Sequence, residues 1–284
     1  MGSEITDCLD GSATHFVLTR FNVRSFYHKA EPTDAWLQER VRLFKDYCIP
    51  GFRHQTENRF TWLVFFDSLS PTWLREEIDG LAEDTFHPVY VDGPFSQEFL
   101  SETIGRLCST PYVITTRVDN DDAVANDFIE TIQGCFESQE AAFINLVNGA
   151  QYAERKLYLR PYTMNPFSSL IERSADNRPA TVFVEHHYRI DAHAPVLNVR
   201  TKHPMWLQVI HGGNVLNEVV GLRTSAGAVA PHFSVQLDVD DSLPARIYDQ
   251  ILGTARILLR LLRKPSRLKD LAKTLVARRA RTSS

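Results

Sequence analysis

The chain has 284 residues, of which 43% are hydrophobic and 23% charged. This composition is that of an ordinary globular protein and excludes intrinsic disorder, collagen-like repeats and a disulfide scaffold. No run of about 20 apolar residues predicts a transmembrane helix, and the acidic N-terminus lacks the apolar core of a secretory signal. The four cysteines are far apart and form no CxxC pair, so we expect reduced thiols in a cytoplasmic protein.

Charge is distributed unevenly along the chain. Residues 254–284 carry ten Lys or Arg and one Asp, a balance of +9, while the rest of the chain has a balance of −13. An acidic body is a poor partner for phosphate backbones, so we expect no nucleic-acid binding. The basic segment alternates arginines with leucines at helical spacing. Such a helix indicates either contact with an anionic membrane surface, here the inner face, or packing on the acidic body.

The first part of the chain alternates short apolar strands with amphipathic helices. Strands are predicted at 16–21, 60–66, 87–91, 112–118 and 142–147, and helices at 34–47, 71–81, 97–108 and 123–136. A near-continuous apolar run such as that at 60–66 is typical of a strand covered on both faces. The alternation predicts an α/β fold with a mostly parallel central sheet flanked by helices.

Beyond Gly149 the pattern changes. A hairpin is predicted at 151–153 and 156–160, a short helix at 168–173 and a strand at 181–184, whereas 205–210 could be strand or helix. The expected organisation is an N-terminal extension over 1–14, one α/β domain over 15–243, and a helical basic tail over 244–284. The domain would have a nucleotide-binding half at about 15–122 and an acceptor half at about 123–243.

The most informative stretch runs from Thr115 to Asp122, where a strand ends in three carboxylates. Ligands of α/β sheets bind at the carboxyl ends of strands. In an extended segment Asp119 and Asp121 face the same side, so together with Asp122 they could hold Mn²⁺ or Mg²⁺ bound to a substrate diphosphate. The alternative is a capped helix start, for which one Asp would suffice.

Several segments, in order, resemble the bacterial putative rhamnosyltransferase family, which has the Rossmann-like GT-A fold of nucleotide-sugar glycosyltransferases. They are Thr19–Arg24, Phe44–Pro50, Gln55–Thr56 with Phe60–Asp67, Thr115–Asp122, Asn165–Glu172 and Met205–Asn214. The resemblance extends from about residue 15 to 217. It implies a metal-dependent, inverting enzyme that moves a sugar from a dTDP- or UDP-linked donor to a glycan or lipid-linked acceptor; the name of the family indicates rhamnose as this sugar.

The resemblance also assigns residues to the parts of the site. The donor would contact Arg20, Asn22, Arg24, Asp67, Arg117, Asp119 and Asn120. The metal would be held by Asp119, Asp121, Asp122 and His211, and the acceptor side would include His187, Trp206, Gln208 and Asn214. The alternatives are a solvated loop for the arginines, a helix cap for Asp67 and a hydrogen-bonded loop histidine for His211.

An inverting transfer needs a carboxylate to take the proton of the acceptor hydroxyl. Glu172 and Glu185 are the candidates, the first in a segment that matches the family and the second after a predicted strand. Histidines at 186, 187, 193 and 203 lack the spacing of a zinc motif. Two other functions stay open: a nucleotidyltransferase that makes the activated sugar, and a non-catalytic module of a glycan assembly complex.

Overall fold

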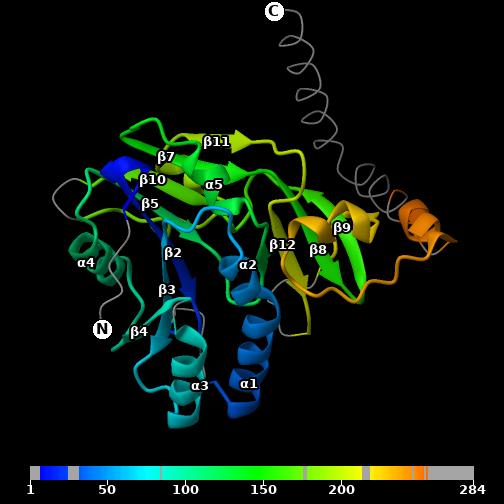
Figure 1. Ribbon diagram of the computed structural model, residues 1–284, viewed down its shortest axis with the longest axis horizontal. Coiled ribbons are helices and arrows are strands. Elements are labelled where there is room, and N and C mark those ends of the chain that lie inside the picture. Colours follow the sequence, from blue (N-terminus) through cyan, green and yellow to red (C-terminus); the bar gives the residue numbers. More distant parts are fainter. Residues whose placement is uncertain are drawn as a thin grey trace, which may run out of the picture.

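The fold is built on a central sheet, shown in Figure 1. The computed structural model describes residues 7–24, 32–83, 85–174, 178–212, 218–244, 246–252 and 254. The described strands of this sheet follow the order β11-β7-β10-β5-β2-β3-β4, and β1 pairs with β2 in addition. Their bounds are β1 (Asp7–Cys8), β2 (Ala13–Arg20), β3 (Thr61–Asp67), β4 (His87–Val91), β5 (Tyr112–Arg117), β7 (Ala141–Leu146), β10 (Ser169–Arg173) and β11 (Val196–Val199).

The pairing of the strands determines which strand ends lie at the same edge of the sheet. β2 runs parallel to both β3 and β5, and β3 runs parallel to β4. β10 is antiparallel to its neighbours β5 and β7, and β11 is parallel to β7. The predicted α/β class is confirmed: four consecutive strands of the sheet are parallel, and their carboxyl ends lie along one edge.

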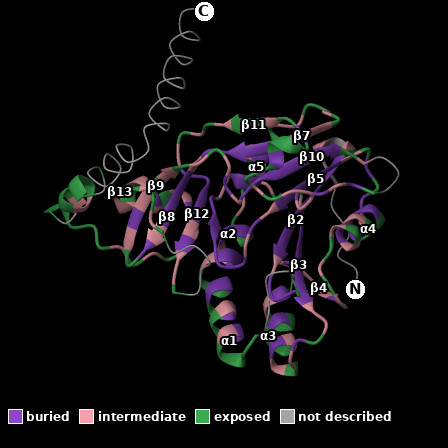
Figure 2. Ribbon diagram, turned by 180° about the vertical axis from the view of Figure 1, so that it is seen from behind, coloured by how far each residue is buried: buried purple, intermediate pink, exposed green. Residues whose placement is uncertain are grey.

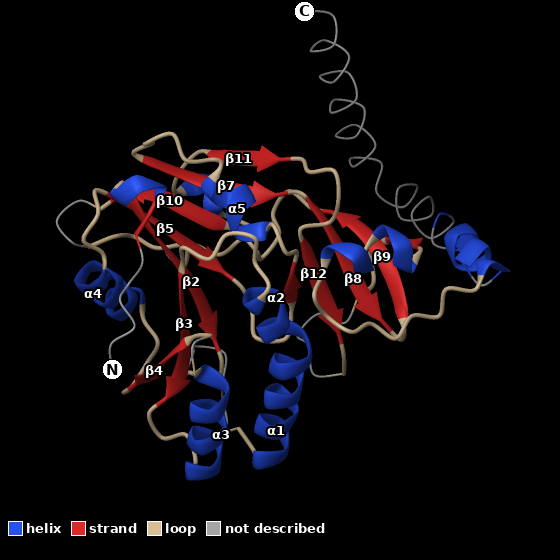
Figure 3. Ribbon diagram, viewed as in Figure 1, coloured by secondary structure: helices blue, strands red, loops and turns tan. Residues whose placement is uncertain are grey.

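Helices cover both faces of this sheet, as Figure 3 shows. They are α1 (Asp34–Leu43), which continues through a π-helical segment (Phe44–Cys48) into α2 (Ile49–Arg53), then α3 (Thr72–Ala82), α4 (Gln97–Leu107) and α5 (Phe128–Gln133). The apolar residues of α1, α2, α3 and α5 join one buried cluster and those of α4 join another. β2 contributes Val17 to the first cluster and Phe16 and Leu18 to the second, because successive side chains of a strand point to opposite faces.

A second sheet lies beside the first and was not predicted. Its order is β13-β9-β8-β12-β6, with bounds β6 (Ala123–Val124), β8 (Asn148–Ala153), β9 (Lys156–Pro161), β12 (Trp206–Ile210) and β13 (Leu222–Thr224). The hairpin of β8 and β9 confirms the predicted one and turns at Glu154 and Arg155, both with positive φ. The chain passes almost directly from β7 to β8, so the two sheets are continuous in sequence.

Trp206 fills the junction between the sheets. Its indole is fully buried, stacks on Phe167 with ring centroids 5.0 Å apart, and donates a hydrogen bond of 2.8 Å to the carbonyl of Leu146. A Cβ on Gly149 would lie only 2.0 Å from this indole, so the position requires glycine. The expectation that Trp206 faces an acceptor is therefore wrong, because the side chain belongs to the core.

Three local predictions are also wrong. Residues 169–173 form a strand between β5 and β7 rather than a helix. The spacing of apolar residues cannot distinguish a helix from a strand in so short a run. Residues 181–184 form a turn, with Thr181 at φ 58°, instead of a strand. The helix predicted at 123–136 begins only at Phe128, because Ala123 and Val124 pair with β12.

The N-terminal part of the chain differs from the expected boundary, whereas the C-terminal part is helical as expected where it is described. β2 begins at Ala13 and pairs with Asp7–Cys8, so part of the predicted extension over 1–14 belongs to the central sheet. At the other end, residues 243–252 are helical where described and present Leu243, Ile247 and Ile251 to solvent. Figure 2 shows this exposed segment at the periphery. Most of the basic tail, 255–284, lies outside the described residues. Of the helices described, none is long and apolar enough to cross a membrane.

Candidate active site

Polar side chains gather at the carboxyl ends of the parallel strands. Arg20 ends β2, Asp67 ends β3, and Arg117 ends β5. Since these strands are parallel neighbours, their last residues lie along one edge of the sheet. β5 then runs into the acidic segment 119–122, so the structure brings the predicted donor and metal residues to the position at which α/β proteins bind ligands.

The acidic segment is a turn and not an extended strand. The backbone N–H of Asp122 donates to the carbonyl of Asp119 at 3.3 Å, which closes residues 119–122 on themselves. The side chain of Asn120 donates to the carbonyl of Phe21 at 3.2 Å and ties this turn to the loop after β2. The expectation that Asp119 and Asp121 face the same side is therefore wrong, because the turn directs the two carboxylates to different partners.

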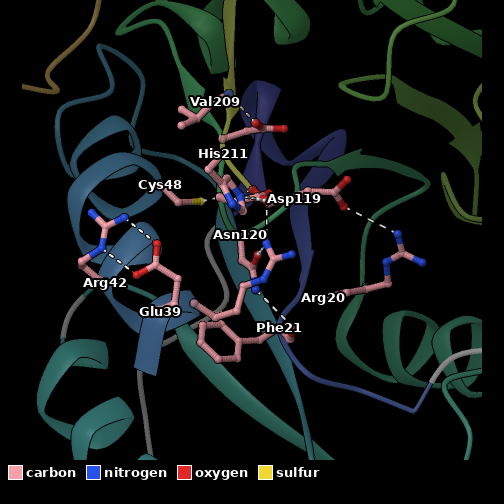
Figure 4. Close-up of polar contacts among 12 residues, drawn as sticks. Arg20, Phe21, Glu39, Arg42, Cys48, Asp119, Asn120, Val209 and His211 are labelled. Atoms are coloured by element: carbon pink, nitrogen blue, oxygen red, sulfur yellow. Dashed lines mark hydrogen bonds and ion pairs between the residues drawn. The ribbon is translucent and has the colours of Figure 1, made fainter. Parts of the chain in front are cut away.

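Asp119 faces two arginines from the adjacent strand ends. Its carboxylate accepts from Arg117 at 3.0 Å and lies 3.6 Å from Arg20, and Figure 4 shows it directed toward Arg20 and away from His211. Desolvation alone would raise the pKa of Asp119, but the charges and hydrogen bonds of Arg117 and Arg20 outweigh it and hold this pKa well below its ordinary value. Both guanidinium groups also lie over the ring of Phe183, at 5.0 Å for Arg20 and 5.5 Å for Arg117.

Asp121 faces the other side of the turn, toward α1 and the end of β12. Its Oδ2 atom lies 2.5 Å from Nη1 of Arg40 and 3.0 Å from Nε2 of His211. The same Arg40 nitrogen donates to Oδ1 of Asn120 at 3.2 Å. The structure thus brings His211 to the acidic turn, as expected, and adds an arginine that the sequence analysis did not include.

Asp122 anchors the turn to the second sheet. Its carboxylate is buried and accepts the backbone N–H of Val209, in β12, at 2.9 Å. Burial and the neighbouring charges of Asp121 and Asp119 raise its pKa well above the ordinary value. The thiol of Cys48, buried beneath the turn, points at the carbonyl of Asp119, and burial raises the pKa of this thiol as well. Asp122 therefore holds the turn against β12 and does not share a ligand cluster with Asp119.

The residues at the turn fit a divalent ion only in part. Within the described chain, no group of three or more His, Cys, Asp or Glu side chains is arranged to hold a metal ion. However, Asp121 and His211 present an oxygen and a nitrogen 3.0 Å apart. Mg²⁺ and related ions often take one or two protein carboxylates and complete their shell with substrate phosphates, and imidazole is a common metal ligand. The pair therefore fits an ion that arrives with a diphosphate.

The other residues that were expected to contact the sugar donor form a hydrogen-bonded network in the loops after β2 and β3. Arg24 pairs with Asp67 at 2.7 Å, and the same carboxylate accepts the backbone N–H of Leu69 at 2.9 Å. Asn22 is buried, accepts the N–H of Asp67 at 3.2 Å and donates to Ser70 at 3.0 Å. Asn22 therefore joins the two loops, whereas Asp67 and Arg24 stay at the edge of the sheet with partly exposed side chains.

The two candidate bases lie in different surroundings. Glu172 is buried on β10, pairs in register with Val113, and accepts the backbone N–H groups of Ala180 and Thr181 at 2.8 Å each. Val113 lies four residues before Arg117, the last residue of β5, which corresponds to about 13 Å of strand, and the acidic turn comes after Arg117. The expectation that Glu172 serves as the base is corrected on this ground: its carboxylate supports a loop at the opposite end of β5.

Glu185 lies in the loop that carries Phe183 over the two arginines. Its side chain is partly exposed, accepts a long hydrogen bond of 3.3 Å from the N–H of His186, and lies 4.0 Å from Nε of Arg189. Its neighbour His187 is half-buried, and desolvation together with the charge of Arg117 lowers the pKa of this imidazole to about 4. The neutral imidazole of His187 thus lies near Arg117 and Asp119, and Glu185 precedes it by two residues in the same loop.

The other acceptor-side residues are only partly placed. Gln208, on β12, accepts hydrogen bonds from Gln151 at 2.9 Å and from Arg160 at 2.5 Å. Arg160 is half-buried and packs on the ring of Tyr162 at 4.6 Å. Asn214 lies outside the described residues.

Sequence reasoning missed Arg40, Phe183 and Arg160. A signal existed for Arg40, because it lies three residues after Leu37 and four before Phe44, on the apolar side of the predicted helix. A charged residue on that face needs a buried partner. Phe183 and Arg160 carried no comparable signal, since their approach to the site depends on a loop and on the second sheet.

The family described as "Putative rhamnosyl transferase" matches residues 27–223. This match covers more than half of the chain and includes the acidic turn, Arg40 and His211. The chain belongs to this family. This membership agrees with the resemblance found in its motifs. A search of the curated proteins found no significant match.

Solved structures show weaker likeness to this family member. S. aureus TarS, residues 1–349, in complex with UDP-GlcNAc has 12% sequence identity and a TM-score of 0.43, over 71% of this chain and 60% of TarS. The UDP complex of the same protein has 11% identity and a TM-score of 0.40, over 69% and 60%. HddC from Yersinia pseudotuberculosis has 7% identity and a TM-score of 0.37, over 68% and 92%. The chain spans less than two thirds of the TarS chains that it matches.

Proposed function

We propose that the protein is a metal-dependent glycosyltransferase that moves rhamnose from a dTDP- or UDP-linked donor to a glycan or lipid-linked acceptor. The observation that carries this proposal is the acidic turn at the end of β5, which has Arg20 and Arg117 on one side and Asp121 with His211 on the other. A nucleotide sugar matches this arrangement, because its negatively charged diphosphate binds cationic groups and its sugar must be oriented beside the diphosphate.

The donor diphosphate would lie over the arginine side of the turn. Arg20 and Arg117 are held by Asp119 and by the ring of Phe183, so their orientation is set before a ligand arrives. Guanidinium groups bind phosphate oxygens through paired hydrogen bonds, and little side-chain freedom would be lost here on binding. Asp67, at the end of β3, would accept the N3–H of a uracil or thymine base.

Asp121 and His211 would hold the Mn²⁺ or Mg²⁺ ion. A bound divalent ion would offset the negative charge that develops on the departing diphosphate. The contribution of the chain is to direct both ligands to one point: Asp121 comes from the turn after β5 and His211 from the end of β12. Asp122 keeps these two elements together through its hydrogen bond from Val209.

Glu185 would act as the base in an inverting transfer. The acceptor hydroxyl oxygen attacks the anomeric carbon, the Glu185 carboxylate takes the hydroxyl proton, and the bond from carbon to the diphosphate oxygen breaks with its electron pair on the diphosphate. The partly exposed carboxylate and its place in the same loop as Phe183 support this role. His187, neutral near pH 7 because of its lowered pKa, would accept a hydrogen bond from the acceptor.

The acceptor side would face an anionic membrane. The helical residues near 243–252 expose Leu243, Ile247 and Ile251 at spacings of four, which place them on one helix face. The following segment, 254–284, has a charge of +9. Apolar side chains next to a cluster of cations are the composition that binds anionic lipid surfaces, and a lipid-linked acceptor would be presented there.

Binding of nucleoside diphosphates tests the proposed function. Calorimetry with UDP or dTDP should show that Mn²⁺ strengthens binding to the wild type and that Asp121→Asn removes this gain. A hydrolysis screen over nucleotide sugars, with and without Mn²⁺, would then identify the donor. Metal-independent binding of equal strength to both proteins would refute the metal site, and absence of any nucleotide binding would refute the proposed function.

A further inference from the structure

Arg40 is an unusual residue for the inner face of a helix. Its side chain is only 15% exposed, and its guanidinium lies over the ring of Trp36 at 5.0 Å. Nη1 reaches Oδ2 of Asp121 at 2.5 Å and Oδ1 of Asn120 at 3.2 Å. Three contacts therefore fix the charged end of Arg40 against the acidic turn.

The Asp121 oxygen that Arg40 contacts is the same one that His211 contacts. Oδ2 lies 2.5 Å from the arginine and 3.0 Å from the imidazole. An ion bound by Asp121 and His211 would have to approach this oxygen, and it would meet a guanidinium already in contact with it. Two cations on one partly buried oxygen repel each other strongly, since few water molecules screen them.

We propose that Arg40 is a positioning residue that competes with the metal ion for Asp121. In the free protein Arg40 neutralises Asp121 and aligns it with His211, and it yields this place when an ion enters with the donor diphosphate. This inference rests on the proposed function. Its consequence is ordered binding: the free protein takes up the ion poorly, whereas the ion and the diphosphate bind well together because the phosphate charge compensates the displaced arginine.

The chain offers a matched control for the charge of Arg40. Arg42 lies on the same helix, two residues away, and pairs with Glu39 at 2.6 Å and Asp46 at 2.8 Å. Its side chain is half-exposed and contacts no residue of the acidic turn in these pairs. Removal of Arg42 therefore changes the charge of α1 by the same amount without freeing Asp121.

Titration of the nucleotide-free protein with Mn²⁺, followed by electron paramagnetic resonance of the free ion, measures this competition directly. Arg40→Gln should bind Mn²⁺ roughly tenfold or more tightly than the wild type, because one competing charge next to Asp121 is removed. Arg40→Lys should fall between them, and Arg42→Gln should stay near the wild type. Saturating UDP should reduce the difference between Arg40→Gln and the wild type.

The sign of the change separates competition from a structural role. If Arg40 only supported the turn, its loss would weaken Mn²⁺ binding, and equal or weaker binding by Arg40→Gln would overturn the inference. An equal gain in Arg42→Gln would do the same. The double variant Arg40→Gln, Asp121→Asn should lose the gain. If no variant binds Mn²⁺ even with saturating UDP, the metal part of the proposed function fails together with the inference. If Arg40→Gln gains nothing over the wild type while Mn²⁺ and UDP still bind together through Asp121, the inference alone fails.

Discussion

At the residue scale, the acidic turn is balanced by arginines. Asp119 is paired with Arg117 and Arg20, and Asp121 with Arg40. Carboxylates this close together would otherwise repel one another. Burial, and then the charges of Asp121 and Asp119, raise the pKa of Asp122. The arginines therefore offset the negative charge of the turn in the free protein.

The two glutamates considered as bases provide a test at the same scale. Glu185→Gln should lower turnover by about 10²–10⁴-fold, since a positioned base is lost, and change the free energy of unfolding little, as expected for a partly exposed side chain. Glu172→Gln should keep turnover near normal. It should lower the free energy of unfolding by about 1–3 kcal/mol, because an amide cannot accept both buried N–H groups.

Steady-state kinetics with the donor found in the hydrolysis screen, and urea unfolding of both variants, measure these effects. The two variants control for each other, since both replace a Glu by Gln. If Glu172→Gln proved inactive while fully stable, the assignment of the base to Glu185 would have to be given up.

At the scale of single elements, β2, β5 and β10 are joined through a buried polar chain. His15 on β2 contacts Thr116 on β5 at 2.8 Å, and Thr116 contacts Ser169 on β10 at 2.7 Å. Gln133 of α5 approaches the other ring nitrogen at 3.3 Å and can donate to it, so that His15 donates to Thr116. Complete burial lowers the pKa of His15 to about 3.

This histidine predicts how stability depends on pH. Below pH 6.5 the unfolded chain binds a proton on His15, whereas the folded protein does not until about pH 3. The unfolded state then binds more protons, so the free energy of unfolding should fall as pH falls through this window, by up to about 1.4 kcal/mol per pH unit from this residue. His15→Gln should show a correspondingly smaller slope.

Urea unfolding at a series of pH values between 6.5 and 4 measures the two slopes. His54→Gln, at an exposed position on the surface, controls for the loss of a histidine. Parallel slopes for the wild type and His15→Gln would show that His15 does not stay neutral in the folded protein.

The loop 180–188 shows how an element without regular structure reaches the site. Its start is held by Glu172, which accepts from Ala180 and Thr181, and by Thr115, whose hydroxyl accepts from Val182 at 2.8 Å. These hydrogen bonds place the ring of Phe183 against the guanidinium groups of Arg20 and Arg117. The loop is therefore positioned from the centre of the sheet, although it contains no strand.

At the scale of the whole molecule, the site is formed where the two sheets meet. Asp121 follows a strand of the central sheet, whereas His211 follows a strand of the second sheet. Trp206 and Gly149 pack tightly at the junction and hold the sheets together. The metal ligands of the proposed site thus come from both sheets, and a change at the junction would alter their separation.

The basic segment predicts a membrane interaction of the whole chain. Replacing Arg256, Arg260 and Arg263 by Gln should weaken binding to anionic vesicles by roughly 3 kcal/mol, on the order of 100-fold, at about 1 kcal/mol per charge. Binding of the wild type should also weaken as salt rises, because exposed charges are screened.

Co-sedimentation with vesicles that contain anionic lipid, and with neutral vesicles, measures this effect. A matched control replaces three exposed arginines of the body, Arg42, Arg173 and Arg189, by Gln. Equal losses in the two triple variants would show that overall charge, and not the basic segment, governs sedimentation.

The sequence by itself determined the α/β class, the first parallel strands and their helices, and the position of an acidic segment after β5. These features are local. A strand buried on both faces is a run of apolar residues, and an amphipathic helix repeats its apolar residues every three or four positions. Ligand-binding polar residues of α/β proteins follow the carboxyl ends of strands. The family resemblance assigned Arg20, Asp67, Arg117 and Asp119 to one site, and the structure has them at neighbouring strand ends on one edge of the sheet.

Only the tertiary structure decided which side chains meet there. Pairings between segments far apart in the chain insert β10 antiparallel into the central sheet, form the second sheet, and bury Trp206 and Glu172. The local spacing of apolar residues does not specify such pairings. The choice of partner for each carboxylate depended on the turn at 119–122 and on the approach of α1. Arg40 reaches Asp121 across 81 residues of sequence, because long-range packing, and not local pattern, brings a helix face to a strand end.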